Sequence, residues 1–253
     1  MSRFVGAAMA TTARPAIRLT RERLFYSGMA LLIFALVVIG FAPTWFMRGS
    51  LATSRPLVPM TPLVILHGTM FTAWIALFVT QAGLISARQH KLHMKLGLAT
   101  IALGAAMVVV GVMTAVGQVE RGNSPPGLDP LTFFTVPFLD MIVFASLIAG
   151  GFAWRRDPQT HKRLMLCATA LMLQPGIGRM EFIPNFMGEL TTAIIAVLGA
   201  TPLLAWDYVQ RGRPHPASLI GIGMLAGQQI VRVLIWKNEA WLAAMGWIVK
   251  TLS

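Results

Sequence analysis

Two histidines of this chain occur in nearly the same short phrase. The phrases are "LHMKLGLATIAL" at residues 92–103 and "THKRLMLCATAL" at residues 160–171. His93 and His161 are each followed by a basic residue two places on, by leucine three places on, and then by small and apolar residues. Neutral imidazoles are common ligands of haem iron and of other transition metals. The repetition makes the two histidines a candidate pair for a shared cofactor.

The composition predicts the environment in which this pair lies. Of 253 residues, 56% are hydrophobic and only 12% are charged, and the mean hydropathy is +0.68. Soluble domains carry about 25% charged residues. Polar residues here separate apolar runs of about 20 residues, the length that crosses a hydrocarbon core. The chain is therefore predicted to be a polytopic membrane protein, and its single cysteine, Cys167, excludes a disulfide framework or a cysteine-based metal site.

We expect an all-α integral membrane bundle of about seven transmembrane helices. The apolar runs place them near 25–47, 61–86, 95–117, 131–154, 162–180, 190–209 and 217–236. Residues 1–24 are expected to form a basic cytoplasmic tail that precedes this transmembrane domain of residues 25–236. The last segment, 237–253, is too short to span and is rich in tryptophan, which is typical of a short helix at the membrane interface.

The basic residues predict the orientation of the bundle. Most of the 21 Lys and Arg residues fall in the N-terminal tail and in the loops after the second, fourth and sixth expected helices. Lys and Arg accumulate on the cytoplasmic side of membrane proteins, so the N-terminus is expected in the cytoplasm and the C-terminus outside. The net charge of +12 matches a lipid bilayer with anionic headgroups, and no nucleic acid is needed to explain it.

Helical spacing predicts which way the two histidines face. Steps of four and three residues from His93 follow a stripe of small and polar residues that includes Gly97 and Gly104, as on faces where membrane helices approach closely. The same steps from His161 reach Arg179, and an arginine within a membrane faces protein or water rather than lipid. Both histidines are therefore expected to point inward at the same depth.

Three hypotheses for the pair remain open. The histidines could be interfacial residues bonded to carbonyls or lipid phosphates. They could instead be the axial ligands of a b-type haem between the helices expected at 95–117 and 162–180. The propionates would then lie near the basic residues Lys95, Arg155, Arg156, Lys162 and Arg163. Thirdly, His90 shares a face with His93, and with His161 the three could bind a non-haem metal. A separate copper site on the outer side is a further alternative, because 16 methionines are present and His67 and Met70 are three residues apart.

A second polar group is expected in the outer half of the membrane. It consists of His67, Asp140, Arg179 and Arg232. A charge at the centre of a membrane costs about 2.5–3.5 kcal/mol on insertion scales, so Asp140 is expected to pair with Arg179 or Arg232, with His67 nearby. The group is either a buried ion pair that fixes helix packing or part of an outward-facing pocket for a small ligand.

Three stretches carry a resemblance to a known group of proteins. They are "HGTMFTAWIALFVTQAGLI", "HKLHMKLGLA" and "RRDPQTHKRLML". These stretches resemble uncharacterised bacterial polytopic inner-membrane proteins, a group distantly similar to the membrane factors of cytochrome oxidase assembly. The resemblance implies a bacterial inner membrane and favours haem or copper chemistry. It supplies no catalytic residue.

The leading hypothesis is a multi-pass membrane protein with a redox or haem/metal-handling role, with haem b as the expected cofactor. Two alternatives belong to other functional classes. One is a carrier of small solutes that uses the outer polar pocket, and the other is a non-catalytic accessory subunit of a membrane protein complex.

Overall fold

The computed structural model describes residues 20–54, 57, 59–125, 127–183 and 189–253, and residues 1–19 of the expected basic tail lie outside them. Every regular element in the described part is helical. In chain order the elements are α1 (Arg21–Phe41), the π-helical turn η1 (Ala42–Phe46), α2 (Pro62–Ser86), α3 (His90–Glu120), α4 (Pro130–Ala153), α5 (Pro158–Ala170), α6 (Leu173–Ile177), α7 (Glu189–Ala200), α8 (Pro202–Arg211), α9 (Pro216–Ile235) and α10 (Glu239–Leu252).

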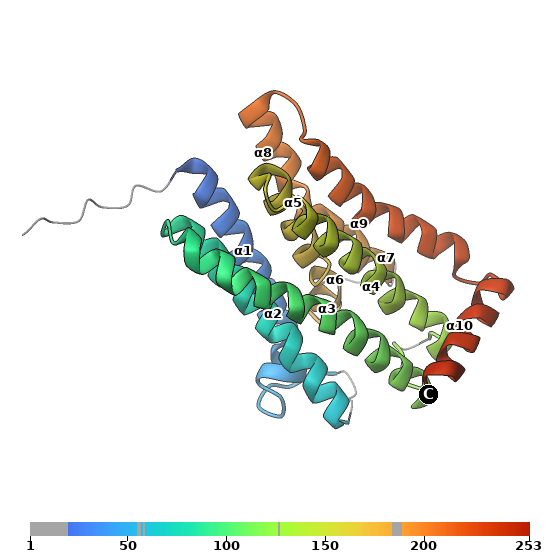
Figure 1. Cartoon of the computed structure of the whole chain (residues 1–253). Helices are drawn as coiled ribbons and strands as arrows, with labels where there is room; N and C mark the ends of the chain where they lie inside the picture. The colour runs from blue at the N-terminus through green and yellow to red at the C-terminus, as the bar shows by residue number, and fades with distance from the viewer. Residues whose placement is uncertain (1–19, 55–56, 58, 126, 184–188) are drawn as a thin grey trace, which may run out of the picture.

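Six helical segments of the described chain are long and apolar enough to cross a membrane. They are Arg21–Phe46, Pro62–Ser86, His90–Glu120, Pro130–Ala153, Leu190–Arg211 and Pro216–Ile235. The start of α1 and the α2–α3, α4–α5 and α8–α9 turns lie at one end of the bundle, and α10 lies at the other (Figure 1). We call these the basic end and the α10 end. The expected all-helical fold is confirmed, and the six apolar helices are compatible with the expected membrane protein, whereas the number of seven spans stays a prediction.

The span expected at 162–180 is not one continuous helix. It consists of α5 and the five-residue α6, with a break at Leu171 and Met172. Pro175 explains the position of the break, because proline lacks the N–H that would bond the carbonyl four residues earlier and its ring clashes with that carbonyl. The carbonyl four residues before Pro175 belongs to Leu171.

This discontinuous segment lies inside the bundle. All residues from 163 to 174 are buried, since α5 packs on α1, α4, α7 and α9 and α6 packs on α1 and α7. Lys162 near the start of α5 pairs with Glu22 at the start of α1. Glu181 beyond α6 accepts a hydrogen bond from Ser54 N, after α1 has ended. The segment therefore runs the length of α1 while its neighbours shield it from lipid.

Trp74 joins four of the helices at the centre of the core. Its side chain is fully buried and contacts the Phe144 ring of α4 edge-on. Its Nε1 donates to Thr169 Oγ1 of α5 over 3.2 Å. A Cβ on Gly104 of α3 would come within 2.8 Å of the indole ring. The small residue at 104 is therefore what lets α3 approach this tryptophan.

The C-terminal segment forms the helix α10, which packs across α3 and α4. Trp241 Nε1 donates to Thr135 Oγ1 of α4 over 2.9 Å, and Met245 is buried. Asn238 caps the helix by accepting a hydrogen bond from Trp241 N. A short helix was expected here; its position at a membrane interface stays a prediction.

Candidate functional site

His93 and His161 come together at the basic end of the bundle. Each is the fourth residue of its helix, α3 and α5 respectively. Their ring centroids are 6.3 Å apart and the two ring planes are nearly perpendicular, at 82°. Both side chains are partly buried. The repeated phrase therefore corresponds to two equivalent helix starts whose imidazoles face each other.

Each imidazole is anchored to the protein through Nδ1. His161 Nδ1 lies 2.8 Å from Gly151 O of α4, and because a carbonyl only accepts, this nitrogen carries the proton and donates. His161 Nε2 is then unprotonated and able to bind a ligand. Hydrogen bonding of Nδ1 to a backbone carbonyl is the usual way in which a metal-binding histidine is oriented.

The Gln81 amide sets the proton position on His93. In the orientation that best satisfies its neighbours, the Gln81 nitrogen donates to His93 Nδ1 over 2.7 Å and its oxygen accepts from Gly97 N over 2.9 Å. His93 then carries its proton on Nε2. In the opposite orientation the Gln81 nitrogen donates to Thr100 Oγ1 over 3.3 Å, and the oxygen faces Nδ1. In the orientation that best satisfies its neighbours, the Gln81 amide therefore makes His93 Nε2 a hydrogen-bond donor.

The space beside the small residues on the His93 face of α3 is mostly filled by neighbouring side chains. Trp74 occupies the space beside Gly104, and the Met141 sulfur lies 2.6 Å from where a Cβ of Gly111 would be. At Gly97, one turn from His93, the nearest group is the Gln81 amide at 3.7 Å. A planar group between the histidines is therefore confined to the basic end, with no room deeper in the bundle along this stripe.

The basic residues expected around this site divide into two sets. Arg163 is fully buried and bonded to Asp207, and Lys162 pairs with Glu22. The other three are exposed and sit at the basic end; they are Lys95, Arg155 and Arg156. Arg163 is therefore a structural residue, and only the exposed set matches the role expected next to an anionic group.

Arg163 and Asp207 form a buried network that the sequence analysis did not identify. Arg163 Nε donates to Asp207 Oδ1 over 3.0 Å, and Nη1 donates to the Gln159 backbone and side-chain oxygens at 2.8 and 2.6 Å. Asp207 Oδ2 accepts from His215 N over 2.9 Å and from Ser218 Oγ over 2.5 Å. The network ties α5 to α8 and to the start of α9. A single carboxylate within an apolar run was the sequence signal for it.

His215 belongs to the same region and caps α9. Burial, followed by the charges of Arg163 and Arg211, holds the pKa of this imidazole below its usual range. A neutral ring leaves Nδ1 free to accept from Ala217 N over 3.1 Å. The positive neighbours thus favour the protonation state that the cap requires.

The structure describes contacts for all four residues expected in the outer polar group. Arg232 Nη2 of α9 donates to Asp140 Oδ1 of α4 over 3.0 Å, one of the two pairings expected. His67 of α2 instead stacks on Phe71, with ring centroids 4.1 Å apart. Arg179, which follows α6, donates to Pro175 O and covers the Phe41 ring of α1 at 4.3 Å.

The structure fits the three-histidine metal site and the two-histidine cofactor site unequally. Among the described residues, no group of three or more His, Cys, Asp or Glu side chains is placed to hold a metal ion. The three-histidine site with His90 is therefore not formed, and His90 is exposed at the first position of α3. The His93–His161 pair is the arrangement that remains for a cofactor that needs two axial ligands.

Comparison of the chain with protein-family models, with curated proteins and with solved structures finds no match.

Proposed function

We propose that this membrane protein has a redox role and holds a b-type haem between His93 and His161, with haem iron bound by Nε2 of each imidazole. The observation that supports this best is the ring separation of 6.3 Å. A metal–imidazole bond is about 2 Å long and a ring nitrogen lies about 1 Å from its ring centre, so two axial imidazoles have centroids about 6 Å apart.

The surroundings of the pair also support the proposal. His161 Nδ1 is occupied by Gly151 O, which leaves Nε2 for iron. The Gln81 amide leaves Nε2 of His93 free only when its oxygen accepts from Nδ1, so haem binding requires the opposite of the orientation that best satisfies its neighbours. When bound, haem supplies one-electron transfer. The chain itself orients the two ligands, limits the depth of the macrocycle through Trp74, and offers Lys95 and Arg156 for the propionates.

We further propose that the protein belongs to a bacterial inner membrane, with the basic end in the cytoplasm against anionic headgroups. Membership of the seven-helix bacterial group that the sequence resembles, and association with a membrane protein complex, form part of the same proposal. The cavity beside α9 has about the volume of one water molecule and is not lined by His67, Asp140, Arg179 or Arg232, so it gives the carrier alternative no support.

A reduced-minus-oxidised absorbance spectrum tests the haem. Haem-replete wild-type protein should give the α and Soret bands of a low-spin b-type haem. His93→Ala and His161→Ala should each lose at least 90% of the band amplitude, since removal of an axial ligand abolishes six-coordinate iron. His90→Ala is the matched control and should keep the bands, because His90 is exposed and three residues from His93. Wild-type protein without bands, or bands unchanged in both ligand variants, would end the proposal.

Cysteine labelling tests the orientation in a Cys167→Ala background. A membrane-impermeant thiol reagent added from outside intact cells should label Glu120→Cys at the α10 end and spare Arg156→Cys at the basic end. Both positions are exposed, so access differs only by the side of the membrane. After the membrane is permeabilised both sites should label. The opposite pattern in intact cells would reverse the proposed topology.

A further inference from the structure

Two arginine–aspartate pairs among the described residues differ in how completely their polar atoms are hydrogen-bonded. At the basic end, the polar atoms of Arg163 and Asp207 have partners in Gln159, His215, Ser218 and each other. Toward the α10 end, Arg232 is 3% exposed and bonds Asp140 through Nη2, while its Nε and Nη1 are buried without a hydrogen-bond partner. The first pair is complete without a ligand, and the second is not.

The incomplete pair continues into a group of buried glutamines. Gln228 lies one turn before Arg232 on α9 and is 6% exposed, and both polar atoms of its side chain lack partners. Gln174 of α6 is 5% exposed; its oxygen accepts from Gln229 over 2.9 Å, while its nitrogen has no partner. Each such buried group costs about 1–3 kcal/mol if nothing satisfies it. Several in one place therefore point to an occupant.

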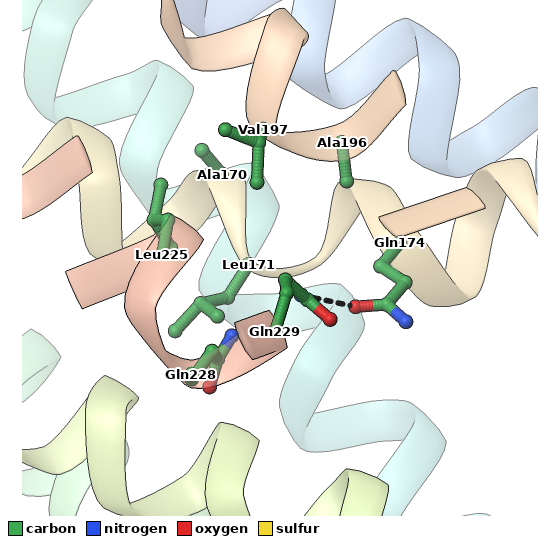
Figure 2. Close-up of a pocket in the computed structure, with 8 residues that line it drawn as sticks. All are labelled: Ala170, Leu171, Gln174, Ala196, Val197, Leu225, Gln228 and Gln229. Carbon is green, nitrogen blue, oxygen red and sulfur yellow. Dashed lines mark hydrogen bonds between the residues drawn. The ribbon is translucent and has the colours of Figure 1, made fainter. Parts of the chain in front are cut away.

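A small cavity lies among these side chains. Its volume is about 10 Å³, and its walls are Ala170, Leu171, Gln174, Ala196, Val197, Leu225, Gln228 and Gln229. Figure 2 shows the glutamines of α6 and α9 on one side and the small and branched side chains of α7 on the other. A polar cavity holds one water molecule when it offers about 10–15 Å³ and two to four hydrogen-bonding partners. This cavity reaches the lower bound of that volume, and Gln174 and Gln228 in its walls carry unpartnered polar atoms.

We propose that water occupies this cavity and continues as a short hydrogen-bonded chain along α9 to the Arg232–Asp140 pair, forming a hydrated polar site within the bundle. Gln228 and Arg232 are four residues apart on α9, a rise of about 6 Å, which two hydrogen-bonded waters span. Unpartnered donors outnumber acceptors here, and the oxygen of each water accepts two hydrogen bonds.

The α5–α6 break provides room for this chain. Because Pro175 lacks an N–H, the helix is interrupted between Ala170, the last residue of α5, and Leu173, the first residue of α6. Ala170, Leu171 and Gln174 all line the cavity. Irregular backbone at membrane depth is tolerated where it lines a water-filled space. Neither His93 nor His161 takes part in this site, so the presence of water here does not depend on whether haem binds.

The melting temperature of Gln228→Leu in detergent distinguishes a hydrated site from a dry one. In a hydrated site leucine expels water and leaves Gln174 and Arg232 unsatisfied, so the melting temperature should fall by at least about 2–4 °C. In a dry site the same change removes two unsatisfied polar atoms, and the melting temperature should rise. Gln229→Leu is the matched control, because it removes a direct bond to Gln174 and should lower the melting temperature in either case.

Water access can be measured separately by deuterium labelling of an engineered thiol, in the Cys167→Ala background. Exchange of S–H for S–D in D2O, followed by the infrared S–H stretch, needs only a water molecule at the sulfur, so a cavity of this size is sufficient. Leu225→Cys in the cavity wall should exchange at least tenfold faster than Leu166→Cys in the dry core, although both positions are buried. Equal rates at the two positions, or a rise in melting temperature for Gln228→Leu, would overturn the proposal. If Gln228→Leu does not fold, the labelling ratio alone decides.

Discussion

Replacement of Asp207 by alanine is expected to lower the free energy of unfolding by about 3–5 kcal/mol. Asp207 is fully buried, and its carboxylate is the counter-charge of Arg163, which is 1% exposed. Without it a guanidinium remains in the protein interior, and His215 N and Ser218 Oγ lose their shared acceptor. Reversible unfolding of the purified protein in mixed micelles, followed by circular dichroism, measures the loss.

Two variants make this result specific to the buried pair. Glu22→Ala removes the partner of Lys162 at a surface position that is 45% exposed, and should cost no more than about 1 kcal/mol. The double variant Arg163→Met/Asp207→Leu removes both charges and should recover most of the loss. If Asp207→Ala costs no more than Glu22→Ala, the pair does not stabilise the basic end as described.

Gly40→Ala is expected to separate α1 from α6. A Cβ at residue 40 would lie 2.1 Å from Gly176 O and 2.5 Å from Gly176 C, which are backbone atoms that cannot turn aside. Overpacking costs about 1–3 kcal/mol and occasionally more, and contact with backbone places this substitution at or above the upper end. The expected result is a loss of about 3 kcal/mol or failure to fold, measured by the same unfolding experiment and by the yield of monodisperse protein.

Gly28→Ala on the same helix is the control for this substitution. No atom lies within 4 Å of a Cβ built at Gly28. Alanine is also the better helix former by about 1 kcal/mol, so Gly28→Ala should be neutral or stabilising. Equal stability of the two variants would show that α1 and α6 do not approach as closely as the structure describes.

The sequence alone determined the helical class of the protein and the limits of three of the seven expected helices to within one residue. Apolar runs and turn residues are local signals. The helices expected at 61–86, 131–154 and 217–236 therefore agree with α2, α4 and α9 to within one residue at each end. The repeated phrase also predicted that His93 and His161 lie at equal depth, because each is a fixed number of residues from a helix start. Their approach to 6.3 Å agrees with that prediction.

Only the tertiary structure decided which distant side chains meet. Asp140 had two arginines as expected partners, and the packing of α4 on α9 selects Arg232. Arg163 and Asp207 are 44 residues apart, and the sequence around either residue does not indicate the other as its partner. The fifth expected span showed its proline and glycines, but its burial depends on the helices that surround it. A sequence pattern predicts which face of a helix a residue lies on and how deep in the bundle it lies. The residue that it contacts depends on which helices are neighbours, and that arrangement depends on contacts among all the helices.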